Sequence, residues 1–180
     1  VWKEKFTNAK EENAFYQNLH DLKQAELPKD IHTEVFKTRY WSTIRYFQEL
    51  GKLELAVTTQ DQLLYSICHP KRLLELVFRF ILFDEGIKKV TRYQQYYGIT
   101  KTIKQIEKTD HSGKRKGGVI WHTQGSGKSL TMVMLAQQIA LSKKIKNPKI
   151  ILVTDRVDLN TQITETFQKC NIPVEEAATG

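Results

Sequence analysis

The sequence contains little cysteine and no long apolar run. Its 180 residues include only Cys68 and Cys170, which are too few and too far apart for a disulfide framework or a cysteine-based zinc site. No apolar stretch reaches the roughly 18 residues of a membrane span, and the N-terminus does not have the pattern of a signal peptide. We therefore expect a cytoplasmic protein with no membrane partner and no structural metal. Because the chain begins at Val1 rather than at methionine, we also expect a piece of a longer protein.

The composition is that of a folded globular protein, with an uneven distribution of charge. At 40% hydrophobic and 27% charged residues, the chain is not a disordered one. Residues 1–90 hold 14 basic and 13 acidic side chains, whereas residues 91–180 hold 14 basic and only 7 acidic ones. The second half is therefore where a nucleotide or a nucleic acid is to be sought. A solvated basic surface is the plain alternative.

The first half is expected to be mostly helical. Apolar residues at helical spacing predict helices over Lys5–Leu27, Thr33–Leu50 and Lys71–Phe83. Pro28 interrupts the first pattern because proline lacks the amide donor of a helix interior, and Gly51 is a natural stop for the second.

In the second half, short expected strands alternate with helices. Two short apolar runs are typical of strands buried on both faces, as in a parallel sheet, and helices follow both of them. Trp121, in the first run, and Trp41 are expected to be core anchors. The expected elements are a helix over Thr91–Ile106, a basic loop over 108–118, a strand over Val119–Trp121, a helix over Ser129–Lys143, a strand over Lys149–Thr154 and a helix over Leu159–Lys169 capped by Asp158.

A glycine-rich loop joins the first expected strand to its helix, where a phosphate-binding loop must lie. The loop residues that would bind ATP are Thr123, Gln124, Gly125, Ser126, Gly127, Lys128 and Ser129. The two glycines allow backbone N–H groups to approach phosphate oxygens, Lys128 would reach the β- and γ-phosphates, and the Ser129 hydroxyl would ligate Mg²⁺. Lys128 and Ser129 would thereby serve catalysis. His122 stands where the strict phosphate-loop pattern has its first glycine.

These residues resemble a known family. Residues 117–132 (Gly-Gly-Val-Ile-Trp-His-Thr-Gln-Gly-Ser-Gly-Lys-Ser-Leu-Thr-Met) resemble motif I of the restriction and motor (R) subunit of type I restriction endonucleases, in which the histidine is typical. Residues 151–159 resemble its motif Ia, and residues 92–99 resemble the glutamine motif of superfamily 2 motors. Residues 69–84 resemble the helix before that motif. The likeness is clear from Ser66 to Gln162 and weak before it.

The resemblance implies roles for further residues. Gln95, with Arg92 nearby, would recognise the adenine edge, and the adjacent Gln94 is the competing candidate. Thr154 and Arg156 would contact the DNA backbone, although a surface ion pair explains Arg156 equally well. The implied cofactors are ATP and Mg²⁺. The implied partners are double-stranded DNA and the modification (methyltransferase) and specificity subunits of a restriction complex.

The expected architecture is α/β, with a helical N-terminal segment before the start of a RecA-like, parallel-sheet motor domain. Residues 1–65 would be the tail of a nuclease-side region or a linker, 66–110 a helical lead-in with the glutamine motif, and 111–180 the first part of the ATPase motor domain. The parent protein would use ATP to translocate double-stranded DNA and to cleave it. Nuclease residues would lie upstream of Val1, and the Walker B and later motor motifs downstream of Gly180.

Two charged features are interpreted as ordinary surface, and two other functions stay open. Asp21-Leu22-Lys23 is the nearest likeness to a nuclease motif and is interpreted as surface charge, and the run Lys114–Lys116 is interpreted as a solvated loop. One alternative is another superfamily 2 DNA-dependent ATPase or helicase without a nuclease. The other is a P-loop kinase or nucleotide-sensing module, although more than half of the chain precedes the loop.

Overall fold

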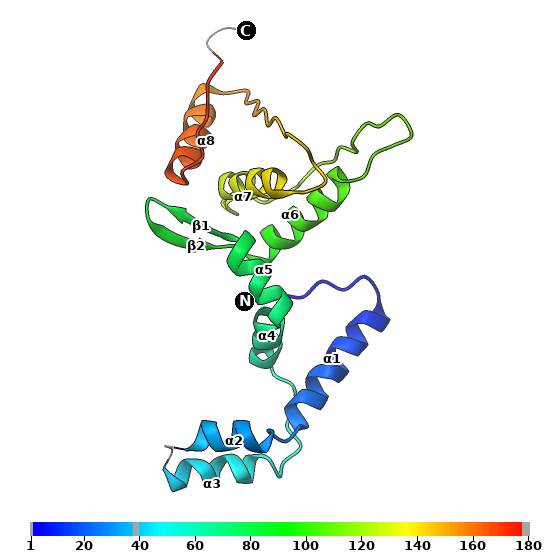
Figure 1. The fold of residues 1–180 in the computed structure, drawn as a ribbon, viewed down its shortest axis with the longest axis vertical. Coiled ribbons are helices and arrows are strands. Elements are labelled where there is room, and N and C mark those ends of the chain that lie inside the picture. Colours follow the sequence, from blue (N-terminus) through cyan, green and yellow to red (C-terminus); the bar gives the residue numbers. More distant parts are fainter. Residues whose placement is uncertain (1, 38–39, 178–180) are drawn as a thin grey trace. The chain divides into compact units, whose positions relative to one another are not determined.

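A computed structural model describes residues 2–37 and 40–177 (Figure 1). The chain divides into two compact units, residues 1–69 and residues 70–180. The first unit is helical. Its elements are α1 (Ala9–Gln24), α2 (Lys29–Phe36), α3 (Trp41–Leu50) and α4 (Thr59–Cys68).

Local sequence signals explain where the helices of the first unit begin. The Asn8 side chain accepts a hydrogen bond from the backbone of Glu11 and caps α1. Pro28 immediately precedes α2, and Thr58 with Asp61 forms a capping box at the start of α4. The predicted helix over Lys5–Leu27 is therefore confirmed with shorter ends.

Two contacts hold α1 against α4. The rings of Phe15 and Tyr65 lie 5.3 Å apart, and Leu19 is buried beside them. Lys23 of α1 forms an ion pair with Asp61 of α4 and donates a 2.8 Å hydrogen bond to the Ala56 carbonyl. A partly buried aromatic pair and a partly buried ion pair therefore join residues that are more than 30 positions apart.

The second unit contains four helices and a hairpin within its described residues. They are α5 (Pro70–Arg79), β1 (Ile81–Asp84), β2 (Ile87–Val90), α6 (Tyr93–Ile106), α7 (Lys128–Leu141) and α8 (Val157–Lys169). β1 and β2 are antiparallel, with Ile81 opposite Val90, and the turn between them has positive φ at Glu85 (50°) and Gly86 (81°). The helices predicted over 91–106, 129–143 and 159–169 are confirmed as α6, α7 and α8.

The core of the second unit lies between α6, α7, β1 and α8. Ile99 of α6 and Val133 of α7 are both 0% exposed, and Phe80 packs on the Tyr96 ring at 4.8 Å. Ile163 and Phe167 are the buried residues of α8, which packs on α7 and β1. At its far end the Glu85 backbone N–H donates a 3.1 Å hydrogen bond to the Lys169 carbonyl. The Lys169 ammonium and the Glu85 carboxylate lie 3.4 Å apart.

Two helix predictions need correction. The helix expected over Lys71–Phe83 ends at Arg79, because residues 81–84 pair with 87–90 across a turn that Gly86 permits with its left-handed backbone. The helix expected over Thr33–Leu50 is two helices, α2 and α3, and Thr38 and Arg39 between them lie outside the described residues.

The predicted parallel strands are wrong for the described chain. Residues 119–121 and 149–154 join no ladder, and Trp121 and Val153 are each 89% exposed. A short apolar run indicates that a segment can be buried, but it does not indicate which strand the segment would pair with. A strand without a partner forms no sheet. The hairpin β1–β2 is the one sheet among the described residues, and the other regular elements there are helices. Trp41, 70% exposed, is not a core anchor either.

Candidate nucleotide-binding site

The glycine-rich loop folds around one of its own carbonyl groups. The Thr123 carbonyl accepts hydrogen bonds from the Ser126 hydroxyl at 2.7 Å and from the Lys128 ammonium at 3.1 Å. Gly125 and Gly127 have φ values of 73° and 81°, a left-handed backbone that favours glycine. The loop is therefore a tight turn that the two glycines make possible.

The start of α7 is suited to bind an anion. Gly127 is the N-cap residue and provides no side-chain cap for the helix. The backbone N–H groups of the first turn therefore face outward with the positive end of the helix dipole, an arrangement that binds phosphate. Thr131, which the sequence analysis missed, donates a 2.9 Å hydrogen bond to the Gly127 carbonyl. Its signal is its position four residues after Gly127, one helical turn away.

Gln95 links α6 to this loop. Its amide nitrogen donates 3.1 Å hydrogen bonds to the Gly127 carbonyl and to the Thr131 hydroxyl. Its carbonyl oxygen accepts a 2.9 Å hydrogen bond from the Arg92 backbone at the start of α6. Gln95 is only 5% exposed, so both of its amide protons and one oxygen lone pair are used inside the protein. A buried glutamine thus joins the N-terminal ends of α6 and α7.

A second contact lies one turn further along α6. A Cβ atom added to Gly98 would lie 3.4 Å from Nε2 of His122, the first residue of the loop. Because Gln95 and Gly98 are three residues apart, they share one face of the helix. That face contacts the loop near both of its ends, His122 and Gly127. The histidine that departs from the strict phosphate-loop pattern therefore lies next to Gly98, at the distance of an ordinary van der Waals contact from a Cβ there.

The other predicted ligands are placed as follows. Arg92 and Gln94 are exposed at the start of α6, next to the buried Gln95. Thr123, Gln124, Gly125 and Lys128 are exposed in the loop, whereas Ser126, Gly127 and Ser129 are partly buried. The fold therefore brings the expected adenine-binding residues and the expected phosphate-binding residues to one edge of the second unit.

The residues expected to contact DNA lie just before α8. Thr154 is partly buried, and Arg156 is the N-cap residue of α8 without a side-chain cap bond. The Arg156 guanidinium lies 3.9 Å from the Asp155 carboxylate, and both side chains are largely exposed. An exposed pair of this kind contributes little to stability, so Arg156 can exchange its partner at little cost. The cap expected from Asp158 is wrong, because Asp158 lies inside the first turn.

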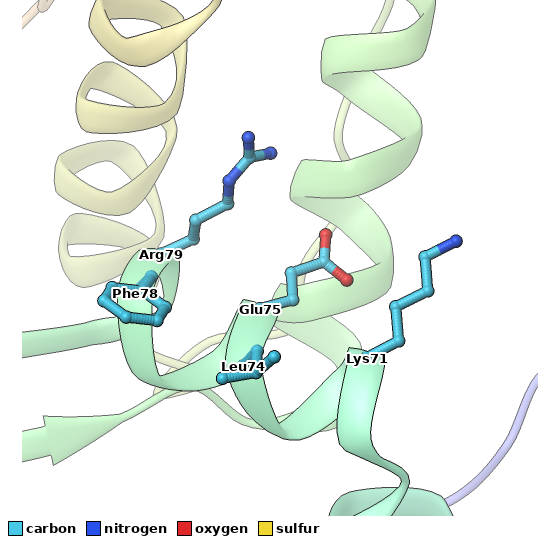
Figure 2. A pocket seen from close by; sticks show the side chains of 5 residues that line it. All are labelled: Lys71, Leu74, Glu75, Phe78 and Arg79. Carbon is cyan, nitrogen blue, oxygen red and sulfur yellow. The ribbon is translucent and has the colours of Figure 1, made fainter.

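A shallow hollow of about 360 Å³ lies elsewhere, along α5 (Figure 2). Its lining residues all come from that helix: Lys71, Leu74, Glu75, Phe78 and Arg79. The Glu75 carboxylate accepts a 2.6 Å hydrogen bond from the Tyr96 hydroxyl of α6. Burial and this bond raise the pKa of Tyr96. Glu75 is thus committed to holding α5 against α6, and the hollow contributes nothing to the nucleotide site.

The comparisons with known proteins agree with the geometry. Residues 94–180 match the family model described as SWI2/SNF2 ATPase. Over 113 residues, the chain is 41% identical to the type I restriction enzyme HindI endonuclease subunit of Haemophilus influenzae. This match covers 59% of the chain and 11% of the relative. The chain is a relative of type I restriction enzyme endonuclease subunits.

Two further relatives support the same relationship. The putative MjaVIIP and MjaIXP type I restriction enzyme endonuclease subunits of Methanocaldococcus jannaschii are 34% and 32% identical to the chain. These matches cover 68% and 67% of the chain and 12% of each relative. The chain therefore spans about one eighth of these endonuclease subunits. The resemblance inferred from the motifs is confirmed.

Three further findings are absences. The search of solved structures gave no significant match. Within residues 2–37 and 40–177, no three His, Cys, Asp or Glu side chains are arranged to hold a metal ion. No helix in the described part of the chain is both long and apolar enough to cross a membrane.

Proposed function

We propose that this chain supplies the ATP-binding part of the motor in a type I restriction enzyme endonuclease subunit. The observation that carries the proposal is the uncapped start of α7, behind a loop with two left-handed glycines and joined to α6 by Gln95. This arrangement combines open N–H groups, a helix dipole and a lysine at one point. The match of residues 94–180 to an ATPase family model supports the same reading.

The loop residues fit the phosphate groups of ATP. The backbone of residues 123–129 would surround them, and the Lys128 ammonium would exchange the Thr123 carbonyl for a phosphate oxygen. Ser129, partly buried in the first turn of α7, would provide its hydroxyl to Mg²⁺. When bound, the metal ion would offset charge on the phosphoryl group being transferred.

Arg92 and Gln95 are our candidates for the adenine ring. The Gln95 carbonyl oxygen accepts one hydrogen bond from the Arg92 backbone and keeps a second lone pair for an amino group. The exposed Gln94 is the alternative, since its amide is closer to solvent. If Gln95 is the adenine contact, the same side chain would bind adenine and hold the phosphate loop through its hydrogen bond to Gly127.

The parent protein's activity follows from the relatives as a proposal. It would use ATP hydrolysis to translocate double-stranded DNA and would cleave that DNA, in a complex with modification and specificity subunits. Thr154 and Arg156 would contact the DNA backbone at the start of α8. A DNA-dependent ATPase without a nuclease remains the second candidate, because the family model that matches describes an ATPase alone.

Binding of a fluorescent ATP analogue tests the nucleotide site. We expect Lys128→Ala to weaken binding at least tenfold, about 1.4 kcal/mol, because the charge facing the phosphates is lost. Lys101→Ala, on the exposed side of α6, removes the same charge and should bind like the wild type. Equal affinity of the Lys128→Ala variant and the wild type would contradict the proposal.

A further inference from the structure

Two basic segments meet at the end of α6 and α7 that lies away from the phosphate loop. The Arg115 guanidinium donates hydrogen bonds to the Ile106 carbonyl at 3.0 Å and to the Lys144 carbonyl at 3.2 Å. Glu107 accepts a 3.0 Å hydrogen bond from the Ser142 hydroxyl. Figure 1 shows the two connections leaving the ends of α6 and α7 side by side. Segments 104–116 and 142–149 therefore form one surface, called the basic surface below.

The basic surface accounts for the net charge of the second half. The two segments hold nine Lys or Arg residues and two acidic residues, a net charge of +7. Residues 91–180 as a whole hold 14 basic and 7 acidic residues, which is also +7. The rest of this half is therefore neutral overall. The lysines of both segments are exposed.

The two acidic residues of the basic surface are already engaged. Glu107 pairs with the Lys144 ammonium at 3.1 Å, and the bonds from Lys144 and Ser142 lower the pKa of its carboxyl. Asp110 accepts hydrogen bonds from the hydroxyl and backbone of Ser112 and from the Lys114 backbone, which lower its pKa. These carboxylates shape the loops and leave the outward lysines to solvent. The remaining positive charge is available to an external anion.

The charge does not serve the nucleotide. α7 has 14 residues, so at 1.5 Å per residue its two ends lie about 20 Å apart. Phosphates at its first turn are therefore well beyond a Debye length, about 8 Å, from the basic surface. Nor do helix dipoles explain the lysines, because their effect is confined to the last turn, and Lys114, Lys116, Lys146 and Lys149 lie beyond the helix ends.

We propose that the basic surface is a second contact for the phosphate backbone of double-stranded DNA, separate from Thr154 and Arg156. Lysines on two loops, fixed to each other by Arg115, offer several ammonium groups that can replace counterions on a duplex. The choice of DNA over another polyanion rests on the proposed function. The location of the contact rests on the charge and hydrogen bonds described above. Lys114–Lys116 is then part of a binding surface and not merely a solvated loop.

Fluorescence anisotropy with a labelled duplex of about 25 base pairs, without nucleotide, tests the proposal across a salt series. The test variant of the full chain is Lys114→Glu/Lys146→Glu. The control is Lys10→Glu/Lys88→Glu, which changes the net charge equally at exposed lysines outside the basic surface. Each lost phosphate contact lowers the slope of log affinity against log salt by about 0.9, so we expect the test variant to lose about two in slope and roughly tenfold in affinity at low salt. The control should retain the larger part of both.

Three outcomes would overturn the proposal. They are equal losses in the test variant and the control, unchanged DNA binding in the test variant, and competition by polyglutamate as strong as by DNA at equal charge. The last would assign the surface to an acidic protein segment. ATP-analogue binding measured on the same samples separates this inference from the nucleotide site. The test variant should bind the analogue like the wild type, whatever happens to DNA binding.

Discussion

At the scale of single residues, Gln95 holds the phosphate loop against α6 and is also the proposed contact for adenine. It is buried, it donates to Gly127 and Thr131, and it accepts from the Arg92 backbone. An apolar replacement would remove these three hydrogen bonds. The Gly127 carbonyl and the Thr131 hydroxyl would still bond to each other, but the Arg92 backbone N–H would lose its partner, and a buried group left unpaired costs about 1–3 kcal/mol. Replacing an exposed glutamine would carry no such penalty, because water can bond to the groups that it contacted. The burial of Gln95 thus makes its role measurable.

We therefore expect Gln95→Ala to lower the free energy of unfolding by about 1–3 kcal/mol in urea titrations. ATP and GTP binding should both weaken because the loop loses its brace, and ATP should weaken more because an adenine contact is lost as well. Gln94→Ala is the matched control and should leave stability unchanged, since Gln94 is exposed. An equal loss for ATP and GTP would remove adenine recognition from Gln95 and leave only positioning of the loop.

At the scale of elements, the N-cap residue of α7, Gly127, can be compared with Gly86 in the turn of the hairpin. Gly127 and Gly86 both have a φ of 81°. A Cβ at Gly127 would lie 2.9 Å from the Gln95 amide nitrogen, whereas a Cβ at Gly86 would meet no atom within 4 Å. The two glycines thus share a backbone conformation and differ in their surroundings.

This pair separates backbone strain from a steric clash. Gly86→Ala should cost about 1 kcal/mol of stability, the usual penalty of a left-handed alanine, and should leave ATP-analogue binding intact. Gly127→Ala should cost more, because Gln95 must move, and should weaken the analogue at least tenfold. Urea unfolding and analogue binding of both variants are the measurements. Comparable behaviour of the two variants would show that the contact with Gln95 does not matter.

Elements that the sequence predicts well are those set by local periodicity. The positions of α6, α7 and α8 follow from apolar residues three or four apart, and the loop before α7 follows from its glycines. The sequence does not predict the hairpin β1–β2. Apolar residues would cover nearly all faces of a helix over residues 71–83, so there is no helical stripe to follow, and Leu82 and Phe83 suit a strand equally well. The strands predicted over residues 119–121 and 149–154 are wrong because strand pairing depends on two segments, and the sequence of one segment does not reveal its partner. The contact of Gln95 with Gly127 joins residues 32 positions apart, which no local pattern encodes.

At the scale of the whole molecule, folding lowers the pKa of carboxyl groups in both units, Asp61 in the first and Glu107 and Asp110 in the second. In the first unit, hydrogen bonds from Lys23 and then from Thr58 lower the pKa of Asp61 to about 2. The carboxylate is thus favoured by folding, with an unfolded pKa near 3.9. Its contribution is complete above about pH 4 and is lost as the pH falls toward 2. The contact it supports, α1 against α4, should loosen over that interval.

Asp61→Asn should therefore lower the free energy of unfolding at pH 7 by about 1 kcal/mol, a value reduced by the partial solvent exposure of the pair. The difference from the wild type should shrink below pH 4 and vanish only below about pH 2, where the wild-type carboxyl becomes protonated in the folded state as well. Urea unfolding at several pH values measures this. Asp21→Asn, on an exposed part of α1, is the control and should show no such convergence. A constant difference across the pH range would contradict the assignment.

The attachment of α8 to the hairpin has a structural consequence. α8 has 13 residues and is about 20 Å long, with Arg156 at its beginning and the bonds between Lys169 and Glu85 at its end. Ile163 and Phe167 fix its middle against α7 and β1. α8 thus connects Arg156 at its start to the hairpin turn at its end and packs on α7 between them. If Arg156 contacts DNA as proposed, that contact and the phosphate loop before α7 are joined through the packing of α8 on α7.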